Sequence, residues 1–215
     1  MAEAGTETPR ERYRAQVRTE IKEHAWGQVA TAGASALSLN AIAKQMGMSG
    51  PALYRYFANR DELITALITD AYRSLADAFR TAAVTGADVA ALAHALRAWA
   101  LDDPQRYLLI YGTPVPGYHA PDDVTLVASE IMTILLDACA ALPPGRPATP
   151  FDAYLEDHRQ WASDHPASAA ALHRGLICWT RLHGILSLEL AGHFTGMGFD
   201  PARLFAAELD DLTAP

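Results

Sequence analysis

The sequence predicts an all-α protein, and three observations support this fold class. Apolar residues recur every three or four positions through most of the 215 residues, which is the spacing of one face of an α-helix. We find no segment with the pattern of a β-strand. The stretch from Ser38 to Phe57 has the layout of two short helices around a tight turn. That layout is typical of a helix-turn-helix, which places one helix in the major groove of DNA.

A long helix is expected before this stretch, from about Arg10 to Ala32. Its apolar residues lie at near-helical spacing and would form one face: Val17, Ile21, Ala25 and Val29. Together with the two short helices it would make a three-helix, helix-turn-helix DNA-binding domain. We place this domain at residues 1–60.

Local sequence signals define the two short helices. Ser38 precedes the apolar-periodic run and suits an N-cap, because its hydroxyl can accept a hydrogen bond from a free backbone N–H. Gly47 lies at the expected turn, where a left-handed conformation costs a residue without Cβ very little. Ser49 is expected to cap the second helix, and Pro51 falls in the first turn of that helix, where a missing N–H is harmless.

The second short helix has an inward and an outward side. Leu53 and Phe57 are expected to pack inward, which leaves the polar tips of the residues between them free to reach DNA phosphates. Arg55 and the exposed start of the helix are the candidates for contacts to base edges. The expected DNA-binding residues are Ser38, Asn40, Lys44, Ser49, Gly50, Pro51, Ala52, Tyr54, Arg55, Tyr56 and Arg60, with Arg10, Arg12 and Arg14 as further phosphate contacts.

The segment from Arg10 to about Leu67 resembles the DNA-binding head of the tetracycline-repressor (TetR) family of bacterial transcription regulators. The matching residues are Ile21, Ala25, Gly33, Ser38 to Ala43, Gly47, Ser49, Leu53 to Phe57 and Leu63. The run ALYRYF, followed by a polar pair and Asp-Glu-Leu, is the most specific part. Many members carry a lysine where this chain has Gly50, so base recognition would depend more on Ser49, Arg55 and the backbone.

The charge distribution is uneven along the chain. The net charge is −8, yet residues 1–60 hold eight Lys and Arg against five Asp and Glu. Residues 61–215 hold nine against twenty. This division fits a protein that docks on DNA by one end, although an ordinary solvated basic helix would give the same division.

Residues 61–215 are expected to form a helical regulatory and dimerisation domain. Prolines and glycines separate its periodic segments, with an irregular connection at 112–117 and a flexible loop at 143–150. The expected helices run from about 60 to 85, 88 to 101, 103 to 111, 122 to 142, 151 to 164, 167 to 193 and 201 to 212.

Part of this domain resembles one subtype of TetR regulatory domain. The resemblance lies in residues 111–118 and in the Trp-x-x-x-His-Gly sequence at 179–184. In such regulators the last two long helices pair with their twins in a four-helix dimer interface, and Gly184 and Gly192 would permit close approach. The implied interface residues are Leu172, Leu176, Gly184, Leu188, Ala191, Leu204, Phe205 and Leu209. The alternative is that these helices belong to an internal core, since periodicity does not distinguish the two.

Aromatic residues of the same domain suggest a small-molecule pocket. Tyrosine and tryptophan combine an apolar body with one polar group, which suits a mostly hydrophobic cavity with few orienting groups. The expected ligand-binding residues are Trp99, Tyr107, Tyr111, Tyr118, Met132, Leu136, Cys139, Trp179 and His183. Ordinary core packing would use the same residue types. Cys139 and Cys178 are too few for a disulfide framework and are expected to be buried, with a redox pair as the alternative.

Together these features predict a homodimeric, sequence-specific DNA-binding regulator, most simply a repressor that a small, mostly apolar ligand releases from a palindromic operator. The alternatives are an activator, a regulator that responds to a protein partner, and a helical small-molecule-binding protein without gene control. We find no catalytic motif and no set of metal ligands, so no enzyme activity, cofactor or metal is expected. We find no apolar run of about eighteen residues. Together with the polar N-terminus, this predicts a soluble, cytoplasmic protein without an export signal or membrane contact.

Overall fold

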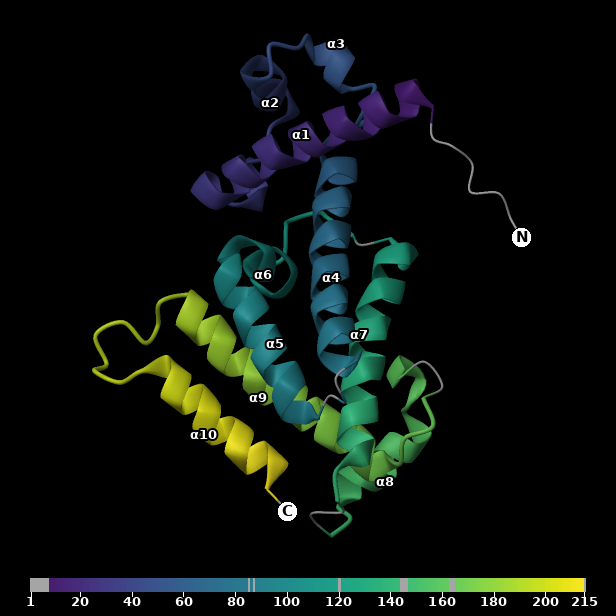
Figure 1. Cartoon of the computed structure of the whole chain (residues 1–215), viewed down its shortest axis with the longest axis vertical. Helices are drawn as coiled ribbons and strands as arrows, with labels where there is room; N and C mark the ends of the chain where they lie inside the picture. The colour runs from purple at the N-terminus through teal and green to yellow at the C-terminus, as the bar shows by residue number, and fades with distance from the viewer. Residues whose placement is uncertain are drawn as a thin grey trace. The chain divides into compact units, whose positions relative to one another are not determined.

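The computed structural model describes residues 8–84, 86, 88–119, 121–143, 147–162 and 165–214. Within these residues every regular element is a helix, so the all-α prediction is confirmed (Figure 1). The elements are α1 (Pro9–Ala32), η1 (Ala34–Ala36), α2 (Leu39–Gln45), α3 (Gly50–Leu53), α4 (Arg60–Val84), α5 (Val89–Asp102), α6 (Pro104–Tyr111), α7 (Asp122–Ala141), α8 (Pro150–Asp157), η2 (Gln160–Ala162), α9 (Ala169–Leu190) and α10 (Pro201–Thr213).

The chain divides into two compact units. The first contains Met1–Asp70 and Pro114–Ala120, and the second contains Ala71–Thr113 and Pro121–Pro215. This division differs from the predicted boundary after residue 60, because the first turns of α4 belong to the first unit and bury Leu63, Ile64 and Leu67. One continuous helix, α4, therefore belongs to both units.

The first unit is built around α1. Its predicted apolar face is buried, with exposures between 0 and 6% at Val17, Ile21, Ala25 and Val29. Thr8 and Glu11 form a capping box that starts the helix. The chain then turns at Gly33, which has a φ of 76°, a left-handed value that glycine adopts without strain.

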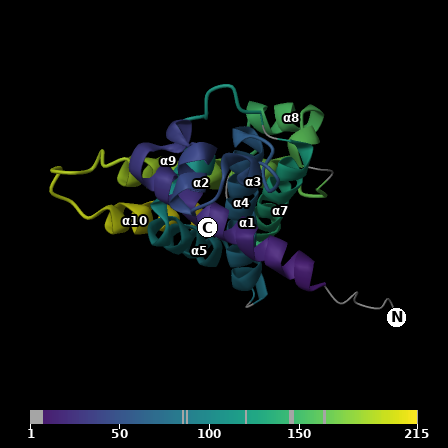
Figure 2. The same ribbon diagram turned by 90° about the horizontal axis from the view of Figure 1, so that it is seen from above.

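The second unit packs α5, α6, α7, α9, α10 and the later turns of α4 around one apolar core. Figures 1 and 2 both show α9 and α10 side by side, with residues 191–200 projecting as a loop beyond their ends. Helix α9 ends at Leu190 with Ala191 as its C-cap, and Gly192 follows in a left-handed conformation with a φ of 77°. Gly192, which was expected within the last long helices, therefore lies in the turn after α9.

Helix α7 is more apolar than was expected from the sequence. Residues Val124–Ala141 are long and apolar enough to cross a membrane, with a mean hydropathy of 1.7, so the expected lack of such a run is wrong. Length and composition do not separate a membrane span from a core helix. Here α7 packs against α5 and α9 and buries Ile131 and Leu135 in the core of the second unit.

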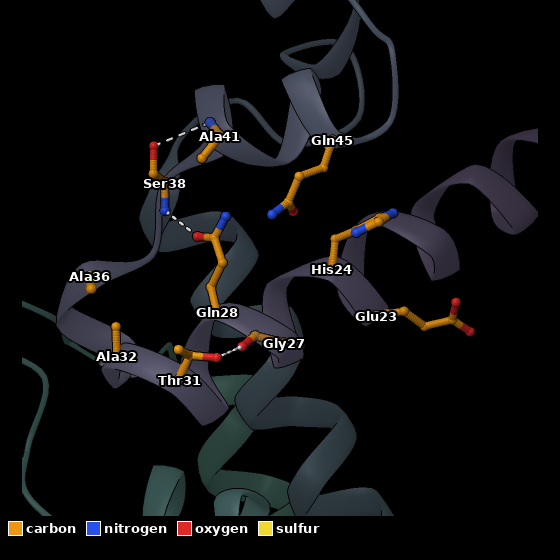
Figure 3. Close-up of a pocket in the computed structure, with 10 residues that line it drawn as sticks. All are labelled: Glu23, His24, Gly27, Gln28, Thr31, Ala32, Ala36, Ser38, Ala41 and Gln45. Carbon is orange, nitrogen blue, oxygen red and sulfur yellow. Dashed lines mark hydrogen bonds between the residues drawn. The ribbon is translucent and has the colours of Figure 1, made fainter.

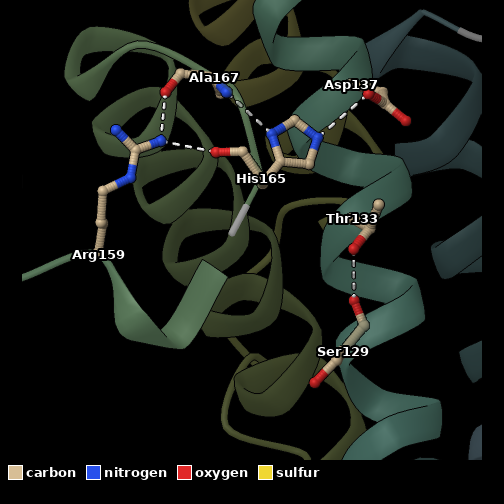
Figure 4. Close-up of polar contacts among 6 residues, drawn as sticks. All are labelled: Ser129, Thr133, Asp137, Arg159, His165 and Ala167. Carbon is tan, nitrogen blue, oxygen red and sulfur yellow. Dashed lines mark hydrogen bonds and ion pairs between the residues drawn. The ribbon is translucent and has the colours of Figure 1, made fainter. Parts of the chain in front are cut away.

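Helix α8 is shorter than the predicted helix at 151–164. It begins at the Thr149 capping box and ends at Asp157, and the short turn η2 follows. Two groups then fix the approach to α9 (Figure 4): the Arg159 guanidinium donates to the backbone oxygens of His165 and Ala167 at 2.6 and 2.9 Å. His165 Nδ1 accepts from the Ala167 N–H at 3.1 Å, and Nε2 lies 3.1 Å from Asp137 on α7. Residues 144–146 of the predicted flexible loop lie outside the described residues.

Candidate DNA interface and regulatory core

The predicted helix-turn-helix is formed by α2, a tight turn and α3. Ser38 is the N-cap of α2, and its hydroxyl accepts from the Ala41 N–H at 3.4 Å, as predicted. Gly47 has a φ of 66°, which confirms the left-handed turn. Leu53 and Phe57 are fully buried, so the second helix is anchored by its apolar side.

Helix α3 differs from the prediction at both ends. Regular α-helix covers only Gly50–Leu53, and the chain continues in turns to Tyr56. Ser49 precedes the helix, but its hydroxyl makes no capping hydrogen bond, so the expected cap is absent. The first backbone N–H groups of α3 are therefore left without a side-chain cap. Such N–H groups can donate hydrogen bonds to an anion.

Arginines of α1 hold the segment after α3 in place. Arg14 donates to the backbone oxygen of Arg55 at 3.0 Å, and its guanidinium lies 5.6 Å from the ring centroid of Tyr56. Arg18 donates to the backbone oxygen of Tyr56 and lies 4.0 Å from the ring centroid of Phe57. Such charged donors satisfy carbonyls that a short helix leaves free. Sequence reasoning missed Arg18 because only the three-dimensional contact reveals its role.

Most of the predicted DNA-binding side chains are exposed. The exposed residues are Ser38, Asn40, Lys44, Ser49, Pro51, Tyr54 and Arg55, together with Arg10, Arg12 and Arg14. Gly50, Ala52, Tyr56 and Arg60 are half-buried. Arg60 donates to the backbone oxygen of Ala34 at 2.9 Å, which gives this predicted phosphate ligand a role inside the first unit.

A groove of about 480 Å³ lies between α1 and α2 (Figure 3). The Gln28 side-chain oxygen accepts from the Ser38 backbone N–H at 2.9 Å across this groove. Gln28 thereby ties the N-cap of α2 to α1. The sequence offered no signal for this contact, because Gln28 lies on the polar side of its helix.

In the second unit, four of the predicted ligand residues form one aromatic cluster. Tyr111 lies 4.3 Å from His183 and 5.6 Å from Trp179, between ring centroids. Tyr107 lies 5.2 Å from Tyr111 and stacks on His183 at 5.6 Å. Tyr72 of α4 also joins, with its ring centroid 6.0 Å from that of Tyr111. We call these five residues the aromatic cluster.

Tyr107 is fully buried and hydrogen-bonded. Its hydroxyl oxygen lies 3.0 Å from His183 Nδ1, 3.1 Å from the His183 backbone oxygen and 2.9 Å from Ser187 Oγ. Burial raises the pKa of the Tyr107 phenol, although the Ser187 contact opposes the shift. The ring is thus fixed between α6 and α9 as a neutral phenol.

Two polar atoms of the aromatic cluster are buried without a hydrogen-bond partner among the described residues: the Tyr111 hydroxyl and His183 Nε2. Burial raises the pKa of Tyr111 and lowers the pKa of His183 to about 4, so both groups are neutral near pH 7. Buried polar atoms of native proteins usually have hydrogen-bond partners. Two such atoms without a partner in one cluster therefore indicate a binding role.

The other predicted ligand residues lie outside the aromatic cluster. Trp99 donates to Ser74 at 3.1 Å and borders Tyr107, and Met132 packs at the edge of the same core. Leu136 belongs to a separate apolar cluster beside α8. Tyr118 lies in the first unit, where its hydroxyl is 3.1 Å from Thr65 Oγ1. We therefore remove Leu136 and Tyr118 from the candidate ligand residues.

Cys139 and Cys178 are free, fully buried thiols whose sulfur atoms lie 4.0 Å apart. The hydrogen bond to Cys178 and burial both raise the pKa of Cys139. Cys139 thus packs as a small apolar residue in the core. Among the described residues no three His, Cys, Asp or Glu side chains gather in a way that could hold a metal ion.

The predicted dimer residues divide between surface and core. Gly184, Leu188 and Ala191 are exposed along one side of α9, with Leu188 at 45%. Leu176 and Leu204 are half-buried. The remaining three are buried in the same chain and leave no area for a partner, so we remove them from the candidate interface: Leu172, Phe205 and Leu209.

Two family signatures match the chain. Residues 21–67 match the family described as bacterial regulatory proteins, tetR family. Residues 89–212 match the tetracyclin repressor-like C-terminal domain. The first covers α2, α3 and the part of α1 from Ile21 onward, which excludes Arg14 and Arg18, and the second covers the aromatic cluster except Tyr72.

Individual proteins are similar along the whole chain. The HTH-type transcriptional regulators Rv1816 of Mycobacterium tuberculosis and Mb1846 of Mycobacterium bovis are each 37% identical over 217 residues, covering 94% of this chain and 92% of theirs. The crystal structure of SCO4313 is 72% identical with a TM-score of 0.89, covering 97% of this chain and 100% of that one. A protein of unknown function from Rhodococcus sp. RHA1, 22% identical, shares the fold with a TM-score of 0.66 over 99% and 97% of the two chains.

Proposed function

The chain belongs to the TetR family of bacterial transcription regulators, and from this premise we propose a homodimeric repressor that a small, mostly apolar ligand releases from a palindromic operator. DNA-binding transcriptional regulation follows from the family membership. The single observation that carries the proposal is the surface of α2 and α3, where exposed polar side chains surround a short helix. Arg14 and Arg18 stabilise the segment after this helix through hydrogen bonds to its backbone oxygens. We further propose that the protein acts in the cytoplasm, where the chromosome lies.

The two kinds of DNA contact would come from different residues. The Arg55 side chain and the uncapped start of α3 face base edges in the major groove. Lys44, Tyr54 and the arginines at the start of α1 contact phosphates and set the register. Two such heads in a dimer would read half-sites about 34–36 Å apart, which requires a palindromic operator.

The exposed side of α9 is the proposed dimer interface. Leu188 and Ala191 lie next to Gly184, where a partner helix can approach closely because no side chain intervenes. Arg181 and Glu208 form an ion pair at 3.4 Å across α9 and α10, which would lie at the polar rim. Leu188→Arg should give monomers in sedimentation velocity, and an unchanged dimer would place the interface elsewhere.

Helix α4 is the proposed route from ligand to DNA. Its Tyr72 contacts Tyr111 in the aromatic cluster, and its first residue, Arg60, donates to the backbone oxygen of Ala34 beside α2. A ligand that moves Tyr72 would thus move the helix that also belongs to the DNA-binding unit. The ligand can shift the equilibrium only by its difference in affinity for the two states, typically about 1–3 kcal/mol.

The test begins with capture of genomic fragments from the source organism by the purified protein. The bound fragments should share a palindrome, and fluorescence anisotropy should separate it from a scrambled duplex of equal length. Arg55→Ala should reduce this discrimination. Arg12→Met should weaken both duplexes by the same factor and lower the salt slope by about 1. Equal affinity of the unmodified protein for palindrome and scrambled duplex would contradict the proposal.

A further inference from the structure

The two unpartnered atoms of the aromatic cluster carry information about ligand chemistry. His183 is only 9% exposed, and its Nε2 atom has no partner among the described residues. The Tyr111 hydroxyl is buried in the same way, and the two rings are neighbours at 4.3 Å. By contrast, the Tyr107 hydroxyl makes three polar contacts on the other side of the imidazole.

These three contacts assign the tautomer of His183. Tyr107 has one hydroxyl proton, and the backbone oxygen at 3.1 Å can only accept it. His183 Nδ1 must then donate to the Tyr107 oxygen, and the Ser187 hydroxyl can donate to the same oxygen. In the opposite tautomer two oxygen atoms would face each other without a proton. His183 Nε2 is therefore a lone-pair acceptor, and it is the atom left without a donor.

Among the described residues, no charged side chain contributes to the pKa shift of either group. Burial is the cause of the shift at His183, and burial together with the phenols of Tyr72 and Tyr107 is the cause at Tyr111. The pKa of His183 is lowered to about 4, so the imidazole is neutral at pH 7. An ion placed here would lose its hydration without gaining an opposite charge, which is a large cost. A neutral ligand avoids this cost.

Space for a ligand requires movement of Trp179. The adjoining apolar cavity, lined by Trp179, Phe79, Leu96 and their neighbours, has a volume of only about 10 Å³. That is scarcely enough for one water molecule. Trp179 lines this cavity and also contacts both residues that carry the unpartnered atoms, with its ring centroid 4.1 Å from that of His183 and 5.6 Å from that of Tyr111. Trp179 is half-buried, and opening this space requires its ring to turn toward solvent.

We propose that the ligand is a neutral, mostly apolar molecule with one hydroxyl group, which donates a hydrogen bond to His183 Nε2 and accepts one from the Tyr111 hydroxyl. A single hydroxyl satisfies both atoms because it is a donor and an acceptor together. This inference rests on the proposed ligand-responsive function. It adds the ligand's charge, its polar group and the two atoms that recognise it.

The test compares four probes of similar size by calorimetry on the full-length protein: 4-propylphenol, 4-propylanisole, propylbenzene and 4-propylbenzoate. The phenol should bind about tenfold more tightly than propylbenzene, the expected gain from two hydrogen bonds. The anisole accepts but does not donate and should fall between them, and the benzoate should bind most weakly. Equal affinity across the series, strongest binding of the benzoate, or no saturable binding at millimolar concentration would overturn the inference.

Tyr111→Phe and Tyr107→Phe are matched variants, since each removes one hydroxyl from α6. Tyr111→Phe should lose about three- to tenfold in phenol affinity while propylbenzene affinity stays constant. Its melting temperature should be equal to or above that of the unmodified protein, because the lost hydroxyl has no partner. Tyr107→Phe should melt lower. Unchanged phenol affinity in Tyr111→Phe would remove Tyr111 from the site.

Operator release by the same four probes, measured by fluorescence anisotropy, separates the two proposals. If the phenol binds with the expected selectivity but leaves the operator complex intact, the ligand chemistry stands and ligand-controlled release fails. If the operator is bound and no probe discriminates by its hydroxyl, the regulatory proposal stands and this inference fails. The ¹⁵N chemical shift of His183 Nε2 gives an independent readout, since it should report an unprotonated nitrogen that changes only when the phenol is added.

Discussion

The DNA-binding unit and the regulatory unit treat their polar atoms in opposite ways. In the first unit, backbone oxygens at the end of the helix-turn-helix are paired by Arg14 and Arg18, and Gln28 pairs the N–H at its start. In the second unit, the aromatic cluster leaves the Tyr111 hydroxyl and His183 Nε2 unpaired in the core. The contacts that support the first unit are thus paired without a ligand, although the start of α3 remains uncapped, whereas the aromatic cluster lacks partners for two buried atoms.

This difference fits two different tasks. A surface that reads DNA needs side chains held in one geometry, so the supporting contacts must be complete before binding. A ligand sensor needs a site whose free energy changes when the ligand arrives, and unpaired buried polar atoms provide such a change. We therefore expect the two units to respond differently to substitution and to pH.

The largest effect should come from Phe57→Ala. Phe57 is fully buried in the first unit and lies 4.0 Å from the Arg18 guanidinium, so its loss removes both core packing and a cation–π contact. We expect a loss of about 3–5 kcal/mol in the free energy of unfolding, measured by urea denaturation. Operator affinity should fall with it. Tyr13→Ala is the control, because Tyr13 is 64% exposed on the same unit and should change stability by less than about 0.5 kcal/mol.

The second effect is a pH dependence from His183. Its pKa is lowered from 6.5 to about 4 by burial, so between these values the unfolded chain binds a proton that the folded chain does not. The contribution to stability is complete above pH 6.5 and is lost as the pH falls to about 4. It amounts to roughly 3 kcal/mol.

The measurement compares unfolding free energies of the unmodified protein and His183→Phe at several pH values. The chain has eight histidines, and the difference between the two curves isolates the contribution of His183 from that of the other seven. That difference should change steadily between pH 6.5 and 4. Parallel curves would show that His183 is accessible to water, and the contrast between the two units would then weaken.

The third prediction concerns a polar contact in the second unit that is complete. Arg97 Nη2 donates to Glu189 Oε1 at 2.8 Å, both side chains are at most 16% exposed, and the contact raises the pKa of Arg97. Arg97→Met should cost about 3 kcal/mol in unfolding free energy, because Glu189 remains nearly buried without its partner. Arg97→Met with Glu189→Met should recover most of that loss. If the double variant has as low an unfolding free energy as Arg97→Met, the two side chains stabilise the fold by more than neutralising each other's charge.

The sequence predicted the fold class and the helix-turn-helix because both depend on local signals. Helical spacing, the Ser38 cap and the Gly47 turn each act within a few residues. The contacts of Arg18 and Gln28 were not predictable in this way, because they join residues 38 and 10 positions apart. A solvent-facing polar residue on a helix looks the same whether or not it caps a distant turn.

Part of the candidate ligand site was also predicted from local spacing. Tyr107 and Tyr111 lie one helical turn apart on α6, and Trp179 and His183 lie one turn apart on α9, so each pair shares a face by spacing alone. Tyr72 was missed because α4 contributes it from far along the chain, and Tyr118 was wrongly included because nearness in sequence did not place it in the same unit. The division of α9 residues between core and surface also required the packed structure.

The smallest expected effect tests the completeness of the DNA-binding surface. Tyr54 is 45% exposed and its hydroxyl is free to meet a phosphate, so Tyr54→Phe should cost about 1 kcal/mol of operator affinity, or roughly fivefold. Phosphate contacts carry no sequence information, so the palindrome and the scrambled duplex should weaken alike in fluorescence anisotropy. The unfolding free energy should stay constant, because the ring remains and no internal contact is lost. A selective loss on the palindrome would instead mean that Tyr54 contacts a base, and the division between positioning and reading residues in the first unit would have to be redrawn.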